Sequence, residues 1–224
     1  MSWTDKTALS TINKLRDEFG IKHFIETGTY KGTNALVQSK NFKYVHSCEI
    51  VPEYIRLASL KLKDESNVEL LNMSSPKFLI KMKDKFKKGI KFIYLDAHFY
   101  DSTLPPEKRF VVLDELNALE DTKNCIIAIH DFDNGKFGHI TYDGQSLNFD
   151  LLKEKLHNVN KEFHYYTNTE CDIIKSGKEI GLEDDEEMLG TLKFVWSAPE
   201  KTKRGLLYCV PKELDLTKYK LREI

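Results

Sequence analysis

The sequence lacks the features of a disulfide-rich, membrane-spanning or nucleic-acid-binding protein. Its cysteines (Cys48, Cys125, Cys171 and Cys209) are far apart and form no CxxC pair, so neither a zinc site nor a redox pair is indicated. Lys and Arg total 34 against 35 acidic residues, and no apolar run is long enough to cross a bilayer. We therefore expect free thiols, a cytoplasmic protein in a reducing compartment, and neither a nucleic-acid nor a membrane partner.

The length of 224 residues suits one sizeable domain and is too short for two large ones. We predict a single domain over residues 1–224. Residues 1–22 should form an N-terminal amphipathic helix, because apolar residues recur there at helical spacing up to a stop at Gly20.

Strand-like and helix-like segments then alternate along the chain. Nearly continuous apolar stretches predict strands at 23–26, 43–50, 67–71, 90–96 and 125–129. Helix-like sequence separates them at 33–39, at 52–63, from residue 74 onward and at 109–119. Apolar strands spaced by helices indicate a parallel sheet that is covered on both faces.

The final third of the chain differs, because strand-like segments follow one another after a helix near 147–156. These segments are 162–166, 191–196 and 205–210. The last two, separated by SAPEKTKR, are predicted to pair as a hairpin and to give the sheet an antiparallel edge. The expected fold is therefore α/β, with a Rossmann-like, doubly wound, mostly parallel seven-stranded sheet and an antiparallel C-terminal hairpin.

Acids and glycines follow the first two strands. The stretch HFIETGTYKG ends its strand at Glu26 and turns through Gly28 and Gly32, where the missing side chains let the backbone approach a ligand. Glu49 closes the second strand about 20 residues later, the offset expected of an acid that bonds ribose hydroxyls. A plain tight turn and an exposed acid are the alternatives, but the combination favours a cofactor site.

The pattern Glu-x-Gly-x-x-x-Gly, an acid closing the second strand and seven strands ending in a hairpin resemble the class I S-adenosylmethionine-dependent methyltransferases. The resemblance runs from about Phe24 to Val210. In that family the glycine turn wraps the methionine end of the cofactor and the second acid holds the ribose, which is implied here for Glu49. The residues implied at the methionine end are Glu26, Gly28, Thr29 and Gly32.

The sequence after the third strand departs from that family. Many relatives carry a Gly-Asp pair there to meet the adenine, whereas this chain has Asn72-Met73-Ser74-Ser75. Met73 could pack on the adenine face, and the Ser74 hydroxyl or amide could bond the adenine. Both serines are equally well explained as helix-capping residues.

The fourth and fifth strands end in unusually polar sequence, YLDAHFYDST and IAIHDF. Both ends should emerge at one edge of the sheet, which would bring together Asp96, His98, Asp101, His130 and Asp131. Acids after neighbouring strands can share a hard divalent cation, and a nearby histidine can ligate a softer metal or act as a base.

The motif Asp-x-His-x-Tyr-Asp-Ser-Thr looks like that of macrocin-type metal-dependent O-methyltransferases and cephalosporin-hydroxylase-like proteins. Those typically carry Asp-x-Asp-x-Tyr-x-Ser-Thr and a later Asp-Asp pair, so histidine replaces an acid at His98 and His130. The resemblance implies that Asp96 and Asp131 hold Mg²⁺ or another divalent cation. Asp96 is also expected at the cofactor, and Asp96, His98 and His130 in catalysis, although one histidine is expected only to cap a strand or bond the backbone.

Together these features predict S-adenosylmethionine-dependent O-methylation of a small polyhydroxylated or sugar-like acceptor, with possible metal assistance. A metal-dependent hydroxylase on the same scaffold and a non-catalytic cofactor- or protein-binding domain are the alternatives. The glycine-punctuated segment 134–160 is expected to cover the substrate, or else to be a surface connection. On the helix at 109–119, Asp114 and Glu115 are expected to be solvated.

Overall fold

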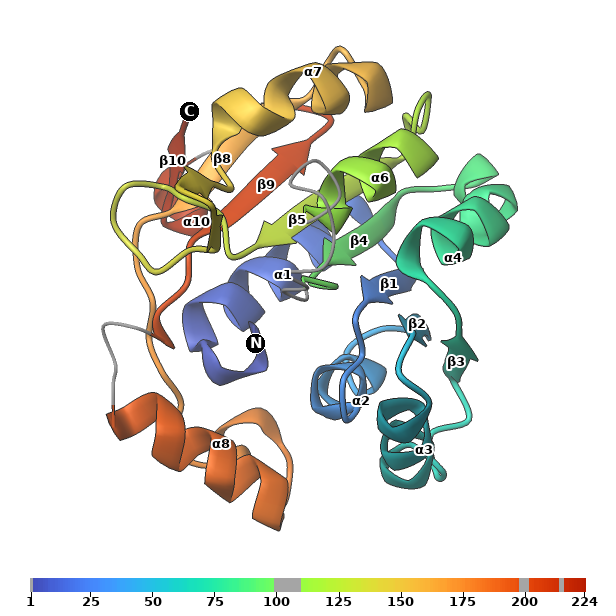
Figure 1. The fold of residues 1–224 in the computed structure, drawn as a ribbon, viewed down its shortest axis with the longest axis vertical. Coiled ribbons are helices and arrows are strands. Elements are labelled where there is room, and N and C mark those ends of the chain that lie inside the picture. Colours follow the sequence, from blue (N-terminus) through green and yellow to red (C-terminus); the bar gives the residue numbers. More distant parts are fainter. Residues whose placement is uncertain (1, 99–109, 198–201, 214–215) are drawn as a thin grey trace.

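Eight strands form the central sheet of the computed structural model, which describes residues 2–98, 110–197, 202–213 and 216–224 (Figure 1). The spatial order is β10-β8-β9-β5-β4-β1-β2-β3. Their bounds are β1 His23–Thr27, β2 Tyr44–Glu49, β3 Val68–Asn72, β4 Lys91–Leu95, β5 Cys125–His130, β8 His164–Asn168, β9 Leu206–Val210 and β10 Leu221–Glu223. Strands β1 to β5 pair in parallel, whereas β9 runs antiparallel to both β5 and β8, and β10 is antiparallel to β8.

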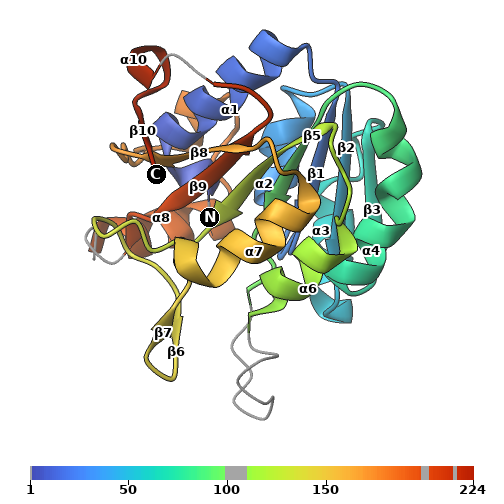
Figure 2. The ribbon, with the colours of Figure 1, turned by 90° about the horizontal axis from the view of Figure 1, so that it is seen from above.

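Helices cover both faces of this sheet, with α6 and α7 on one side and α1 on the other in Figure 2. Buried side chains of α4, α6 and α7 join one hydrophobic cluster, and those of α1, α2 and α3 join a second one across the sheet. The helices are α1 Lys6–Phe19, α2 Thr33–Ser39, α3 Pro52–Lys61, α4 Ser75–Met82, α6 Val111–Ala118, α7 Phe149–Val159, α8 Glu186–Ser197 and α10 Leu216–Tyr219. Shorter elements are η1 Ser2–Thr4, η2 Lys83–Lys87, η3 Gly177–Ile180, β6 Thr141–Tyr142 and β7 Gln145–Ser146.

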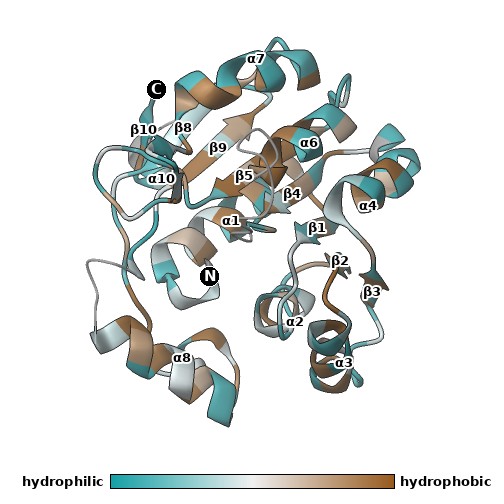
Figure 3. Ribbon diagram, in the orientation of Figure 1, coloured by the Kyte–Doolittle hydropathy of each residue, from teal (hydrophilic) through white to brown (hydrophobic). Residues whose placement is uncertain are grey.

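The hydrophobic core lies where the central strands meet these helices, and β5 and β9 are accordingly brown in Figure 3. Cys48, Cys125 and Cys209 are buried in it, and all four cysteines are free thiols as expected. Within the described ranges, no helix has the length and apolar character needed to cross a bilayer.

The predicted N-terminal helix corresponds to α1, which is shorter than the predicted range 1–22, since η1 precedes it and Gly20 follows it. Its first turn is capped by Asp5, whose carboxylate accepts a hydrogen bond from the Thr7 amide at 2.9 Å. Gly20 ends the helix in the left-handed conformation, with φ of 59°. The side chains of Ile12 and Leu15 are fully buried against the sheet.

The prediction of a strand at 191–196 was wrong, because these residues belong to α8. A run this short fits a strand or a buried helix equally well from its composition alone. The helical conformation buries Met188, Leu192 and Val195 together, because these residues recur at helical spacing. The antiparallel hairpin of the sheet is instead made by β8 and β9, and the connection 169–205 between them carries α8.

Candidate active site

The order of the strands reverses between β1 and β4, which are neighbours in the sheet. From there the chain runs outward through β2 and β3 on one side and through β5 on the other. Ligands of open α/β sheets bind beyond the carboxyl ends of the strands at such a point. A pocket of about 420 Å³ lies at this place. The predicted site residues that line it are Glu26, Gly28, Thr29, Asp96, His98, His130 and Asp131.

Four other predicted site residues lie outside the lining of this pocket: Gly32, Glu49, Met73 and Ser74. Gly32 begins α2 with φ of 89°, and a side-chain carbon there would come within 3.2 Å of Ala58 on α3. Met73 packs, partly buried, against the hydrophobic core. Ser74 occupies the N-cap position of α4, but its side chain makes no capping hydrogen bond. The predicted adenine contact of Met73 and Ser74 stays a prediction.

Gly28 brings the loop after β1 against the end of β4. Its φ is +76°, and a Cβ atom there would lie 2.7 Å from both the Cα atom of Ala97 and the carbonyl oxygen of Asp96. Only glycine fits so close a backbone approach with this dihedral angle. The turn after β1 therefore lies in close backbone contact with Asp96 and Ala97, which follow β4.

Glu26 is a buried carboxyl group surrounded by hydrogen-bond donors. Its Oε1 accepts from the Asn34 side-chain amide at 2.6 Å, and its Oε2 accepts from the hydroxyls of Ser47 at 2.6 Å and Thr29 at 3.0 Å. Burial raises the pKa of Glu26 to about 7, although these hydrogen bonds act in the opposite direction. The carboxyl group can therefore change charge near neutral pH.

The Glu49 carboxylate fixes the two loops beside it. Its Oε2 accepts a hydrogen bond from the Tyr30 amide and its Oε1 one from the Val51 amide, each at 2.9 Å. Each oxygen keeps a further acceptor position. The predicted contact of Glu49 with ribose hydroxyls is compatible with these bonds and stays a prediction.

Asp96, His130 and Asp131 form a compact charged cluster on the pocket wall. The His130 Nδ1 atom lies 3.1 Å from Asp96 Oδ1 and 3.3 Å from Asp131 Oδ1. Arg204 adds a second cation, with its Nε atom 3.2 Å from Asp131 Oδ1. Asp101, which the sequence grouped with these residues, lies outside the described residues.

Charge pairing sets the protonation of this cluster. Burial disfavours the charged form of His130, but the carboxylates of Asp96 and Asp131 outweigh it and raise the pKa of the imidazole. Burial likewise opposes ionisation of the two acids, yet the His130 charge lowers the pKa of Asp96 and that of Asp131. In the metal-free protein the three groups thus favour one another's charged forms, an imidazolium between two carboxylates.

His98 lines the pocket beside this cluster. Its Nε2 atom lies 3.2 Å from the backbone carbonyl oxygen of His130, so an Nε2–H tautomer donates a hydrogen bond to it. Its Nδ1 atom is buried and has no hydrogen-bond partner in the part of the chain that the structure describes. That tautomer leaves a lone pair on Nδ1.

The expectation that Glu115 is solvated was wrong. Its side chain is fully buried, and neither carboxyl oxygen reaches hydrogen-bond geometry with any described residue. Burial raises the pKa of Glu115, while the hydroxyls of Ser75 and Thr27 and the His98 ring act against that shift. These neighbours are distant in sequence, so local periodicity on α6 could not reveal them.

One wall of the pocket was not predicted from the sequence. This wall is built by α8, whose residues 191–196 were predicted to be a strand. Glu187, Thr191, Phe194 and Val195 line the pocket from this helix. Further lining comes from η1 and from Arg204 just before β9. Reading 186–197 as a helix would have placed Glu187, Thr191 and Phe194 on one side, since they are spaced by four and three residues.

A lysine clasp holds the start of α8 beside α3. The Lys61 ammonium group lies 2.9 Å from Asp185 Oδ2, 2.6 Å from Glu187 Oε2 and 2.9 Å from the Thr33 hydroxyl. The Lys61 side chain is only 14% exposed, so these interactions are partly shielded from water.

Replacing Lys61 with alanine should loosen α8 and leave the sheet intact. Losing these partly buried charge-assisted bonds should lower the local opening free energy of α8 by about 1–2 kcal/mol. Amide hydrogen exchange within 186–197 should then accelerate, while β4 and β5 keep their protection. Lys63→Ala is the matched control, because Lys63 is exposed on the same turn of chain. Unchanged hydrogen exchange in α8 would contradict the conclusion that Lys61 holds this helix in place.

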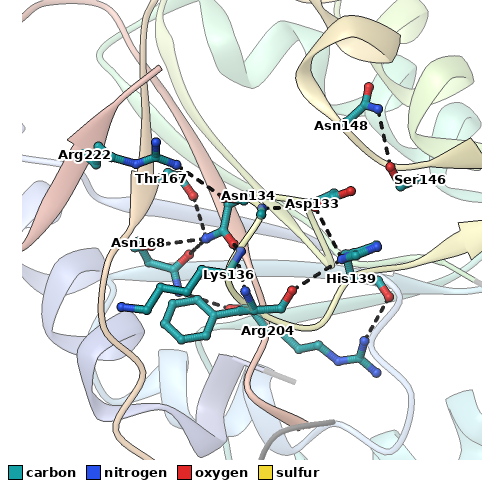
Figure 4. Close-up of polar contacts among 12 residues, drawn as sticks. Asp133, Asn134, Lys136, His139, Ser146, Asn148, Thr167, Asn168, Arg204 and Arg222 are labelled. Carbon is teal, nitrogen blue, oxygen red and sulfur yellow. Dashed lines mark hydrogen bonds and ion pairs between the residues drawn. The ribbon is translucent and has the colours of Figure 1, made fainter.

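The segment after β5 is anchored by polar contacts to β8 and to Arg204 (Figure 4). The Asn134 side-chain amide donates to Thr167 Oγ1 at 3.0 Å and to Asn168 Oδ1 at 3.1 Å. Arg204 donates to the His139 carbonyl oxygen at 3.2 Å. Among the described residues, none from 134–160 lines the pocket. The substrate-covering role of this segment stays a prediction.

Comparison with known proteins places the fold. No protein-family model and no curated protein matches this sequence. A human methyltransferase 10 domain containing protein has 14% identity and a TM-score of 0.54, over 91% of this chain and 82% of that one. The methyltransferase domain of bacterial CtHen1-CN has 11% identity and a TM-score of 0.50, over 92% and 98%. An rRNA methylase from Streptococcus thermophilus has 12% identity and a TM-score of 0.50, over 92% and 96%.

These similarities extend over nearly the whole chain. The protein therefore has the Rossmann-like α/β fold of these methyltransferase structures, and the predicted fold class is confirmed.

Proposed function

We propose that the protein is an S-adenosylmethionine-dependent methyltransferase that acts on an oxygen of a small polyhydroxylated or sugar-like acceptor. One observation carries the proposal: the pocket at the strand-order reversal joins the glycine turn after β1 to the acid and histidines after β4 and β5. Its volume of about 420 Å³ suits a small ligand. The fold shared with methyltransferase structures supports the same reaction class.

The residues around the glycine turn suit a cationic cofactor. S-adenosylmethionine carries an ammonium and a sulfonium group, and when bound it supplies a methyl group whose bond to sulfur breaks as a bond to the acceptor oxygen forms. Glu26 offers a buried carboxyl group that can ionise near neutral pH, and Gly28 leaves room for close backbone approach. We assign the methionine end of the cofactor to these residues and the ribose to Glu49.

The cluster of Asp96, His130 and Asp131 is proposed to hold a divalent cation. Their ligand atoms lie within 4.8 Å of one another, a spacing that one ion can bridge. Two carboxylates with an imidazole suit Mn²⁺, Fe²⁺ or Zn²⁺ better than Mg²⁺, which prefers oxygen ligands. A bound cation lowers the pKa of a hydroxyl group that it contacts.

We assign removal of the acceptor proton to His98. Its Nδ1 atom has no hydrogen-bond partner among the described residues, whereas His130 Nδ1 is held between two carboxylates. In this arrangement the acceptor hydroxyl gives its proton to His98, and Asp96, which lines the same pocket, orients the hydroxyl. His130 is then the third proposed ligand of the cation, beside Asp96 and Asp131.

Calorimetric titration tests the cofactor and the cation separately. We expect the folded protein to bind S-adenosylmethionine and S-adenosylhomocysteine, and to bind Mn²⁺ in addition. Asp131→Asn should weaken Mn²⁺ binding at least about tenfold, because a proposed ligand and its charge are lost, and should leave S-adenosylhomocysteine binding unchanged.

Asp150→Asn, which removes an exposed acid on α7, is the control for the cation titration. If neither cofactor form binds the folded wild-type protein, the methyltransferase proposal fails. If Asp131→Asn binds Mn²⁺ as tightly as the wild-type protein does, only the metal assignment fails.

A metal-dependent hydroxylase is the second candidate. It is favoured by His130 at the centre of the cluster, because non-haem iron oxygenases also combine imidazole and carboxylate ligands, although their usual set is two histidines and one carboxylate. Oxygen consumption with added Fe²⁺, without any methyl transfer, would favour this candidate. Cofactor binding with neither reaction would leave the binding-domain alternative.

A further inference from the structure

Helix α8 has three distinct sides. Met188, Leu192 and Val195 form the buried side. Met188 and Leu192 pack in one cluster with Trp3 and Leu9, and Val195 also reaches the pocket lining. Glu187, Thr191 and Phe194 form the side that lines the pocket. Leu189, Lys193 and Trp196 form the third side, which is exposed. All three sets are spaced by four and then three residues, so each occupies its own stripe along the helix.

The pocket stripe contains an aromatic ring that is largely exposed. Phe194 is 61% exposed although it lines a concave site. Glu187 already contacts Lys61 and Thr33, so its carboxylate serves to hold α8 in place. Thr191 and Phe194 are therefore the members of the stripe that can meet a ligand, one with a hydroxyl group and the other with an apolar face.

We propose that Thr191 and Phe194 select the acceptor, which is a ring that carries hydroxyl groups on its edge and presents an apolar face. The inference rests on the proposed methyltransferase function. The hydroxyl edge would lie toward Asp96 and His98, and the apolar face would pack on the Phe194 ring. Both a sugar ring, through its C–H face, and a catechol ring have this chemistry.

Binding to the protein saturated with S-adenosylhomocysteine tests the proposal. Methyl α-glucopyranoside and catechol, each titrated at millimolar concentration, are the two probes. They distinguish an acceptor with a sugar ring from an acceptor with an aromatic ring. We expect at least one of them to bind. Phe194→Ala should raise its Kd about tenfold, and Phe194→Tyr should restore it, because an aromatic face is kept.

Leu189→Ala is the matched control, because Leu189 is 52% exposed on the same helix but lies outside the pocket. It should leave the Kd of the probe unchanged, and all variants should bind S-adenosylhomocysteine as the wild-type protein does. The inference is overturned if a probe binds Phe194→Ala as tightly as it binds the wild-type protein. It is also overturned if Leu189→Ala raises the Kd of the probe as much as Phe194→Ala does, or if neither probe binds. Failure of S-adenosylhomocysteine itself to bind overturns the proposed function instead.

Discussion

Gly28→Ala should destabilise the protein by about 3 kcal/mol more than Gly135→Ala does. The two glycines have nearly the same positive φ, +76° and +74°, so the penalty for placing alanine in the left-handed region is the same at both. At Gly135 an added Cβ meets nothing within 4 Å. At Gly28 it would lie 2.7 Å from backbone atoms of Asp96 and Ala97, which cannot move aside as a flexible side chain could.

Denaturant unfolding of the two variants measures this difference directly. The clash should also push the loop after β1 away from the end of β4, so Gly28→Ala should lose cofactor affinity in whatever fraction remains folded. Equal unfolding free energies for the two variants would show that the loop and the strand end are not in close contact.

Between pH 5 and 8 the wild-type protein should lose up to about 3 kcal/mol of stability through Glu26. The pKa of Glu26 is about 7 in the folded protein and ordinarily 4.5, so folding favours the neutral carboxyl group. The stabilisation is therefore fully present below pH 4.5 and is lost as pH rises through 7. Glu26→Gln cannot ionise, and the hydroxyls of Ser47 and Thr29 can rotate to bond its amide.

The difference between the pH–stability curves of wild type and Glu26→Gln isolates this contribution. The variant should become the relatively more stable protein as pH rises from 5 to 8. Glu53→Gln serves as the control, because Glu53 is exposed and pairs with Arg56 on the helix surface. Parallel curves for wild type and Glu26→Gln would mean that Glu26 is already ionised in the folded protein at pH 5.

Local sequence patterns were sufficient for the parallel half of the sheet. Strands β1, β2, β4 and β5 are buried on both faces and β3 is partly buried. Their continuous apolar runs and the helices between them could therefore be recognised without knowing their partners. The polar ends of these strands also met as expected, since parallel strands carry their carboxyl ends to one edge. Glu26, Asp96 and Asp131 therefore reached one pocket.

The errors arose where long-range packing decides the outcome. Within 191–196, the buried Leu192 and Val195 are joined by the exposed Phe194 and Trp196, so the six residues alone do not show the helical spacing that starts at Met188. Glu115 is covered by elements that lie far from it along the chain, and its sequence neighbours resemble those of a solvated acid. Neither environment is encoded within a short window.

The connection that carries α8 starts and ends at neighbouring strands of the sheet. Thr167 on β8 pairs with Leu207 on β9, so residues 169–205 leave and rejoin the sheet side by side. The free energy of closing such a loop changes only slowly with its length. Evolution can therefore exchange, lengthen or shorten this insertion, and with it the wall of the pocket, while the strand ends that carry Asp96 and His130 keep their positions. In the proposed methyltransferase, acceptor selection and the chemistry at the strand ends could therefore diverge independently.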